Sequence, residues 1–359
     1  MKIDKTKFKK MRMIKTASFF LLMFTASSVC GQSILQDYFN GNKDSMVAEA
    51  TKLINMPDPT FKPYQLKNNN LETKKASDHG HVNSFKSFYF TVRDNKKIFA
   101  YQFPHKSNNT IIFIHGVKST GFEYNKTAKL LQEATKAEVF AIDLRGHGKS
   151  AGKDGDVDYI NQYADDIIDI VKFLRKQKPK GKIIIAGHSM GGGVTLNYAM
   201  NKNKLKIDGI LLFAPLIGHN SPAIQQSQPA VTDTLEPGMK IHIGRIIGLK
   251  MFNELGNHSK DSLPVLFFNM PEKMPLRKYT YRANMSMAPE DYAEGLKSIS
   301  VPALVIIGSR DEAFNAEILK KAVTENSKAK VQIIIEATHS SIKYNKQGFE
   351  EVKKWFVAL

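Results

Sequence analysis

The chain has 359 residues, of which 42% are hydrophobic and 24% charged, and a formal net charge of +18. This length and composition are typical of a globular protein with an ample core. The basic residues are scattered without an arginine-rich stripe, which favours a solvated basic surface over nucleic-acid binding and leaves peripheral contact with an anionic membrane open. The single cysteine, Cys30, excludes an internal disulfide and a cysteine metal site.

Residues 1–31 have the pattern of a secretory signal peptide. Basic residues are concentrated at the start of this segment. The apolar run ASFFLLMFTA comes next and is followed by small residues. The run is shorter than the ~20 apolar residues that a membrane-spanning helix needs. We expect cleavage after Gly31 and export to the periplasm or the cell exterior. Anchoring as a lipoprotein through Cys30 is the alternative, although Val29 stands where such signals carry a small residue.

A lead-in segment, residues 32–84, precedes a regular pattern of strands and helices. The lead-in has weak periodicity, and we expect one short helix in it, at about residues 44–54. The stretch SFYFTVRDNKKIFAYQF then predicts two strands around the turn Asp94-Asn95. Apolar runs alternate with helix-like segments from there on. They predict strands at 110–114, 138–142, 182–186, 209–214, 303–307 and 331–335.

A hairpin that leads into repeated strand–helix units predicts an α/β fold. Its central sheet is mostly parallel and is covered by helices on both faces. The interval between the strands at 209–214 and 303–307 is far longer than a strand–helix connection. We therefore assign residues 85–215 and 301–359 to the two parts of the core, and residues 216–300 to an inserted helical cap. The methionines and aromatic residues of the cap either line an apolar channel or fill its own core.

The stretch AGHSMGGG, residues 186–193, places Ser189 directly after a predicted strand. Gly187 and Gly191 complete a G-x-S-x-G motif, and a helix is expected at 190–201. In such an elbow the serine backbone is strained, and the glycines let strand and helix approach closely. The motif therefore predicts a nucleophilic hydroxyl presented above the sheet, beside a helix N-terminus that favours negative charge.

A serine nucleophile requires a base, an orienting carboxylate and donors for the oxyanion. Asp311 and His339 follow the last two predicted strands, in the chain order that this fold uses. Ligands in parallel sheets bind at the carboxyl ends of the strands, where these residues stand. The backbone N–H groups of Val117, after the strand at 110–114, and of Met190, after the serine, are the predicted oxyanion donors.

Other polar residues after strands are predicted to be structural. His115, His147 and His188 stand in glycine-flanked turns, where packing or backbone hydrogen bonding is expected, and Asp143 precedes the serine in the chain. The alternating aspartates of GKDGDVDY lack the glycine and glutamate of an EF-hand loop. We expect Asp156 or the aspartate two residues later to cap the following helix, and we expect no metal and no cofactor.

Five motifs in order make the chain resemble the α/β-hydrolase superfamily across residues 85–359. They are FIHGV, DLRGHGKS, GHSMGGG, GSRD and THS. More narrowly, the chain resembles the monoacylglycerol lipase and lysophospholipase-like branch, which also contains serine aminopeptidase-type sequences. The resemblance implies Ser189 as nucleophile, His339 as base and Asp311 as its partner in an acyl-enzyme mechanism. The cap matches no motif of the family.

We expect an exported serine hydrolase that cleaves monoacylglycerol, lysophospholipid or similar short- to medium-chain acyl esters. A serine aminopeptidase on the same fold is the alternative, and it would need acidic groups to bind the amino terminus of its substrate. A haloperoxidase-like activity would use the same triad. A non-catalytic binding protein is a further reading, but such proteins usually lose a triad member. Epoxide hydrolases and haloalkane dehalogenases carry aspartate where Ser189 stands.

Overall fold

The computed structural model describes residues 42–62, 82–225 and 238–359. These residues belong to two compact units. The smaller unit contains the described residues up to 56 and residues 244–258, and the larger unit contains the rest. The predicted signal peptide and Cys30 lie outside the described residues. Across the described ranges, no helix is long and apolar enough to cross a membrane.

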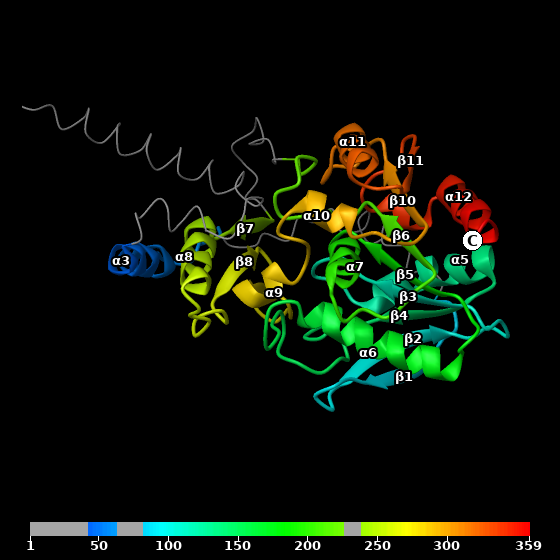
Figure 1. Ribbon diagram of the computed structural model, residues 1–359, viewed down its shortest axis with the longest axis horizontal. Coiled ribbons are helices and arrows are strands. Elements are labelled where there is room, and N and C mark those ends of the chain that lie inside the picture. The colour runs from blue at the N-terminus through cyan, green and yellow to red at the C-terminus, as the bar shows by residue number, and fades with distance from the viewer. Residues whose placement is uncertain (1–41, 63–81, 226–237) are drawn as a thin grey trace, which may run out of the picture. The chain divides into compact units, whose positions relative to one another are not determined.

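The larger unit is built on an eight-stranded sheet in the order β1-β2-β4-β3-β5-β6-β10-β11 (Figure 1). Its strands are β1 (Lys86–Thr91), β2 (Lys97–Phe103), β3 (Thr110–Ile114), β4 (Glu138–Ile142), β5 (Ile183–His188), β6 (Gly209–Phe213), β10 (Ala303–Gly308) and β11 (Lys330–Ile334). The β1–β2 hairpin is antiparallel, as is its pairing with β4, and the other neighbours pair in parallel. This confirms the predicted α/β fold.

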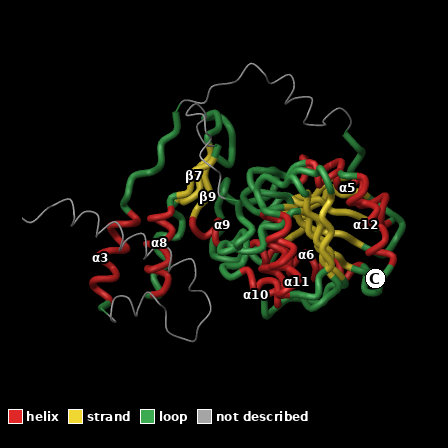
Figure 2. Tube along the Cα trace, turned by 90° about the horizontal axis from the view of Figure 1, so that it is seen from above, coloured by secondary structure: helices red, strands yellow, loops and turns green. Residues whose placement is uncertain are grey.

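Helices cover both faces of this sheet. They are α5 (Asn125–Thr135), α6 (Gln162–Gln177), α7 (Met190–Met200), α11 (Ala316–Asn326) and α12 (Lys346–Val357), with the 3-10 helices η1 (Gly121–Tyr124) and η2 (Ser341–Tyr344). Helix α5 packs against α12, and α6 packs against α7. The two views place these pairs on opposite faces of the sheet (Figures 1 and 2).

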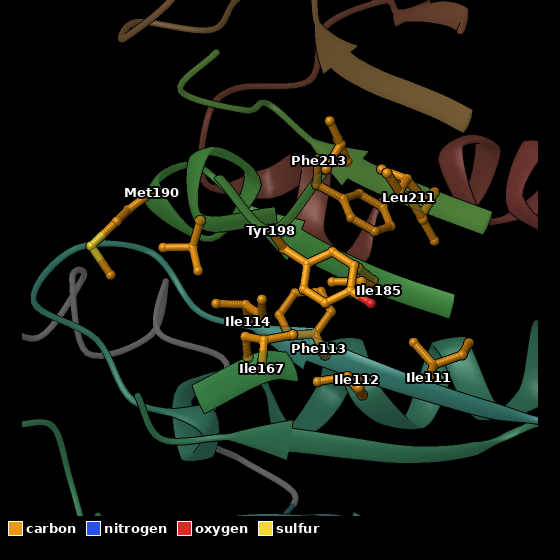
Figure 3. Close-up of a cluster of buried hydrophobic side chains, with 14 of the residues drawn as sticks. Ile111, Ile112, Phe113, Ile114, Ile167, Ile185, Met190, Tyr198, Leu211 and Phe213 are labelled. Carbon is orange, nitrogen blue, oxygen red and sulfur yellow. The ribbon is translucent and has the colours of Figure 1, made fainter. Parts of the chain in front are cut away.

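The central strands form because their residues are apolar on both faces. Every residue of β3, β5, β6 and β10 is buried, as expected of parallel strands with helices on both sides. Figure 3 shows side chains of β3, β5 and β6 in one cluster with Ile167 of α6 and Tyr198 of α7. β3 and β4 have the predicted bounds, and the other core strands differ by at most two residues.

The insertion between β6 and β10 has both helices and strands. Its elements are β7 (Met239–Ile241), α8 (Ile243–Glu254), β8 (Pro264–Phe268), β9 (Lys278–Thr280), α9 (Tyr281–Met285) and α10 (Tyr292–Lys297). The three strands form an antiparallel sheet of their own. The sequence analysis predicted only helices here, because two of these strands have only three residues, too few for an alternating pattern to be recognised in the sequence.

The smaller unit packs helix α3 (Lys43–Ile54) of the lead-in against α8 of the insertion. The backbones approach closely, since a Cβ on Gly248 would lie 2.7 Å from the carbonyl oxygen of Ala50. The guanidinium of Arg245 donates to the carbonyl oxygens of Ile54 at 3.1 Å and Met56 at 3.0 Å, and so caps the end of α3. The predicted helix at 44–54 is confirmed, but its partner had no signal in the sequence.

Candidate active site

Ser189 stands in a strained turn between β5 and α7. Its backbone has φ 54° and ψ −118°, a region that non-glycine residues rarely occupy. The Ser189 N–H donates to the carbonyl oxygen of Phe213 at 3.1 Å, and its carbonyl oxygen accepts from the N–H of Leu216 at 2.9 Å. These bonds to the end of β6 hold the strained residue in place, as expected for the elbow motif.

The glycines around Ser189 are required by close backbone contacts. A Cβ on Gly187 would lie 2.3 Å from the carbonyl oxygen of Gly191, so β5 and the first turn of α7 leave no room for a side chain. A Cβ on Gly191 would lie 2.2 Å from the carbonyl oxygen of Ile114 at the end of β3. The N-terminus of α7 is therefore packed beside the end of β3, where the predicted oxyanion loop begins.

Asp311 and His339 are joined by a hydrogen bond of 2.9 Å between Asp311 Oδ2 and His339 Nδ1. The other carboxylate oxygen, Oδ1, accepts from the backbone N–H groups of Ala313 at 2.9 Å and Phe314 at 2.8 Å. Because a carboxylate accepts, Nδ1 carries the ring hydrogen and Nε2 is left as the basic nitrogen. The side chain of Asp311 is fully buried, and that of His339 is 16% exposed.

A hydrogen bond from His188 connects the loop of His339 to the turn that carries Ser189. Its Nε2 donates to the carbonyl oxygen of His339 at 2.9 Å, and the two rings lie 4.7 Å apart between centroids. Burial, with the nearby charges of His339 and Lys343, lowers the pKa of His188 well below that of a free histidine, so the ring is neutral. Since His188 directly precedes Ser189, this bond connects the loop of His339 to the turn that carries the serine.

A tyrosine connects the same histidine to the oxyanion loop. The N–H of Gly116 donates to the hydroxyl oxygen of Tyr124 at 3.0 Å, and that hydroxyl donates to Nδ1 of His188 at 2.8 Å. A Cβ on Gly116 would lie 3.4 Å from Cβ of Ser189. The sequence analysis missed Tyr124 because a tyrosine at a helix end carries no motif. The structure thus brings the loops after β3, β5 and β11 to one point.

The two predicted oxyanion donors have N–H groups that face no acceptor within the described part of the chain. His115 orients one of them. Its Nε2 accepts from the N–H of Leu144 at 3.1 Å, and its Nδ1 donates to the carbonyl oxygen of Gly116 at 2.8 Å. That carbonyl and the Val117 N–H belong to one trans peptide, so holding the carbonyl also aims the N–H of Val117 in the opposite direction. The N–H of Met190 lies at the start of α7.

Asp143 and His147, which follow β4, make hydrogen bonds to the backbone. Asp143 is fully buried and accepts from the backbone N–H groups of Gly121 at 2.7 Å and Lys149 at 2.8 Å. His147 donates from Nδ1 to the carbonyl oxygen of Arg145 at 2.9 Å. Within the described ranges, no three histidine, cysteine, aspartate or glutamate side chains gather where they could hold a metal ion.

The expectation that Asp156 or Asp158 caps the helix after GKDGDVDY is wrong. The residue before α6 is Asn161, which makes no capping bond with its side chain. Asp156 instead accepts from Thr280 Oγ1 at 2.7 Å and from Nε and Nη2 of Arg282, both at 2.8 Å. The carboxylate therefore binds residues 124 and 126 positions away, and the two parallel N–H groups of a guanidinium make this a strong, charge-assisted contact.

Comparison with known proteins places this chain in a family. Residues 105–343 match the model of the family described as serine aminopeptidase, S33. Two Mycoplasma proteins that carry an esterase/lipase name are similar: one of M. genitalium, 31% identical over 138 residues (38% of this chain, 47% of that protein), and one of M. pneumoniae, 25% identical over 256 residues (69% and 88%). Monoglyceride lipase of Rattus norvegicus is 30% identical over 115 residues, which are 32% of this chain and 37% of that protein.

A solved esterase structure from Pyrococcus furiosus has the same fold, with a TM-score of 0.52, 20% identity and coverage of 84% of this chain and 98% of that chain. The chain spans about half the length of the M. genitalium relative and less of the rat lipase. The family model matches well over half of the chain. The chain therefore belongs to the serine aminopeptidase S33 family of α/β hydrolases, in its monoacylglycerol lipase-like branch of esterases and lipases.

Proposed function

We propose that this protein hydrolyses carboxylic esters through an acyl-enzyme formed on Ser189. The observation that carries the proposal is the bond between Asp311 and His339, on a loop that His188 ties to the serine turn. A strained serine, a histidine with a free basic nitrogen and a buried carboxylate are the parts that serine hydrolases combine. The esterase and lipase names of the relatives support an ester as substrate.

In the proposed mechanism, Ser189 Oγ attacks the ester carbonyl carbon while His339 Nε2 takes the hydroxyl proton. Asp311 stabilises the imidazolium that forms. The carbonyl π electrons move to the oxygen, and the N–H groups of Val117 and Met190 bind this oxyanion, each such donor typically being worth ~10²–10³ in rate. The imidazolium then protonates the departing alcohol. Water, activated by the same histidine, releases the acid and restores the serine.

We propose acyl esters of the monoacylglycerol or lysophospholipid kind as substrates, ahead of aminoacyl amides. An aminopeptidase would need a carboxylate near the site to bind a substrate ammonium group. The glutamates in the described part of the insertion are exposed: Glu254, Glu272, Glu290 and Glu294. Lys118, which follows the predicted oxyanion donor, and Lys343, in η2 after His339, carry positive charges that oppose binding of a cation.

A fluorophosphonate probe and a substrate panel test this function. The wild type should bind the probe covalently and hydrolyse p-nitrophenyl esters, and Ser189→Ala should lose both. Ser87→Ala, the same change at an exposed serine of β1, should behave as the wild type. If an acyl channel is present, kcat/KM should rise about fourfold for every methylene added to the acyl chain, until the channel is full.

Two outcomes would contradict the proposal. Full labelling of the Ser189→Ala variant would show that Ser189 is not the nucleophile. Alanine or proline p-nitroanilides turned over faster than the esters would replace the esterase by an aminopeptidase. A flat response to acyl length with an intact esterase would leave the mechanism standing and exclude the acyl channel.

We also propose export of the protein, from the basic and apolar pattern of residues 1–31. The intact mass of the mature protein tests it. A chain that begins at Gln32 supports a cleaved secretory signal, and a diacylglyceryl group on Cys30 supports a lipoprotein. A mass that retains residues 1–31 would contradict export by either route.

A further inference from the structure

A tyrosine of the insertion holds the peptide that follows Val117. The backbone N–H of Lys118 donates to the hydroxyl oxygen of Tyr279, at 2.9 Å across 161 positions of the chain. Lys118 has φ 59°, in the left-handed region that lysine rarely adopts. Its ammonium group lies 4.7 Å from the ring centroid of Phe268. Phe268 and Tyr279 come from the neighbouring strands β8 and β9, so the insertion contacts the strained residue twice.

The hydroxyl of Tyr279 is fixed in direction by a second partner. Because its oxygen accepts from Lys118, its hydrogen is donated to Nε2 of His147, at 2.9 Å. Nδ1 of His147 donates in turn to the carbonyl oxygen of Arg145 at 2.9 Å. Tyr279 and His147 are both buried. The chain of bonds therefore runs from the loop after β4, through the insertion, to the loop after β3.

Strand β9 is itself held firmly on the loop after β4. The N–H of Thr280 donates to the carbonyl oxygen of Gly155 at 3.1 Å. Gly155 has φ 66°, and a Cβ there would lie 2.0 Å from the carbonyl oxygen of Lys278. With the bonds from Thr280 and Arg282 to Asp156, these contacts leave Tyr279 little room to move. Tyr279 is therefore held in place independently of Lys118, and it can fix the position of the Lys118 peptide.

We propose that Tyr279 is a positioning residue that orients Val117 as an oxyanion donor, an inference that rests on the proposed function. Val117 lies between two peptide planes. The plane before it is held by the bond from His115 to the carbonyl oxygen of Gly116, and the plane after it by the bond from Lys118 to Tyr279. An oxyanion hole accelerates a reaction only when its donors are oriented before charge develops. The insertion thus contributes to catalysis indirectly, through the orientation of Val117.

Removal of the hydroxyl by Tyr279→Phe tests the proposal in the full chain. The strained Lys118 peptide would lose its acceptor, and the N–H of Val117 would no longer be held in direction. Complete loss of a donor costs ~10²–10³ in rate, and misorientation should cost less, about tenfold in kcat. KM for a p-nitrophenyl ester should change less than twofold, because substrate in the ground state carries no oxyanion.

Tyr163→Phe is the matched control. Tyr163 is equally buried, its ring lies 6.1 Å from that of His147, and its hydroxyl has no hydrogen-bond partner among the described residues. This variant should keep the kcat of the wild type. Titration of active sites by complete fluorophosphonate labelling corrects both variants for any fraction that fails to fold.

A trifluoromethyl ketone separates an effect on the oxyanion from a general loss of structure. It forms a tetrahedral oxyanion adduct, so Tyr279→Phe should weaken its binding about tenfold, in step with kcat. Unchanged kcat and inhibitor affinity in this variant, with an active wild type, would overturn the inference alone. A fall in kcat with unchanged inhibitor affinity would also overturn it. A wild type that neither hydrolyses esters nor binds the probe would overturn the proposed function and the inference together.

Discussion

The two carboxylate oxygens of Asp311 accept hydrogen bonds from different partners. Oδ1 faces the N–H groups of Ala313 and Phe314, and Oδ2 faces Nδ1 of His339. In an asparagine at this position, the oxygen would have to stay with the two N–H groups, which only donate. The amide NH₂ would then face His339 and force its hydrogen onto Nε2, where no proton can be accepted from the serine.

Asp311→Asn should therefore lower kcat by ~10³–10⁴ with little change in KM, because a wrong tautomer of the base has a cost of that order in a related triad. Steady-state kinetics on a p-nitrophenyl ester measures it. Asp291→Asn is a matched control, since Asp291 Oδ1 also accepts from two backbone N–H groups, those of Ala293 and Glu294, and its Oδ2 accepts from the amide of Asn220. An Asp311→Asn variant within tenfold of the wild type would show that another group orients the base.

At the scale of elements, the insertion is anchored to the core by a mostly buried ion pair. The side chain of Asp156 is 7% exposed and that of Arg282 is 22% exposed, with 2.8 Å between them. Burial raises the pKa of the carboxyl, but the bonds from Arg282 and Thr280 outweigh this and lower it. Such a pair adds little to the free energy of unfolding while both partners are present. Removing one partner is strongly destabilising, because it leaves a buried charge unpaired.

Asp156→Asn should reduce the free energy of unfolding by roughly 2 kcal/mol, less than the loss for a fully buried pair because Arg282 is partly solvated. Glu336→Gln should reduce it by less than about 0.5 kcal/mol, since the Glu336–Arg310 pair is exposed, with side chains 63% and 67% accessible. Urea unfolding of both variants gives the comparison. Equal losses in the two variants would show that Asp156 does not anchor the insertion.

At the scale of the whole molecule, three histidines are buried as neutral rings. Burial lowers the pKa of His147 to about 4, and lowers those of His115 and His188 well below the value of a free histidine. Below pH ~6.5 the unfolded chain takes up protons at these positions and the folded chain does not. Stability is therefore greatest above this pH and declines as the pH falls towards 4. Burial raises the pKa of Asp166 to about 6, which offsets one histidine below pH 6.

Urea unfolding between pH 7 and pH 5 should show this decline, with each neutral histidine contributing about 1.4 kcal/mol per pH unit within its window. His147→Gln should be less stable at pH 7 but should lose stability less steeply on acidification. His105→Asn, at an exposed position, should keep the slope of the wild type. A His147→Gln variant with the same slope as the wild type would show that His147 is not held neutral.

The sequence alone determined the α/β core and the candidate triad. Buried parallel strands are apolar on both faces, and strands such as β3 and β4 are therefore visible in a single chain. Ser189, Asp311 and His339 could be identified because the strand–helix order dictates which chain positions meet at one edge of the sheet. Local patterns and a fixed topology are enough for these assignments.

Only the tertiary structure decided what holds the site in place. The bonds from Tyr124 to His188 and from Tyr279 to Lys118 join residues 64 and 161 positions apart. A tyrosine hydroxyl finds its partner through packing, which leaves no periodicity in either segment. The same reason applies to Asp156. Its carboxylate accepts hydrogen bonds from Arg282 of the insertion and does not cap the next helix. Long-range polar contacts depend on the relative positions of the folded segments, and the packing of the whole chain determines those positions.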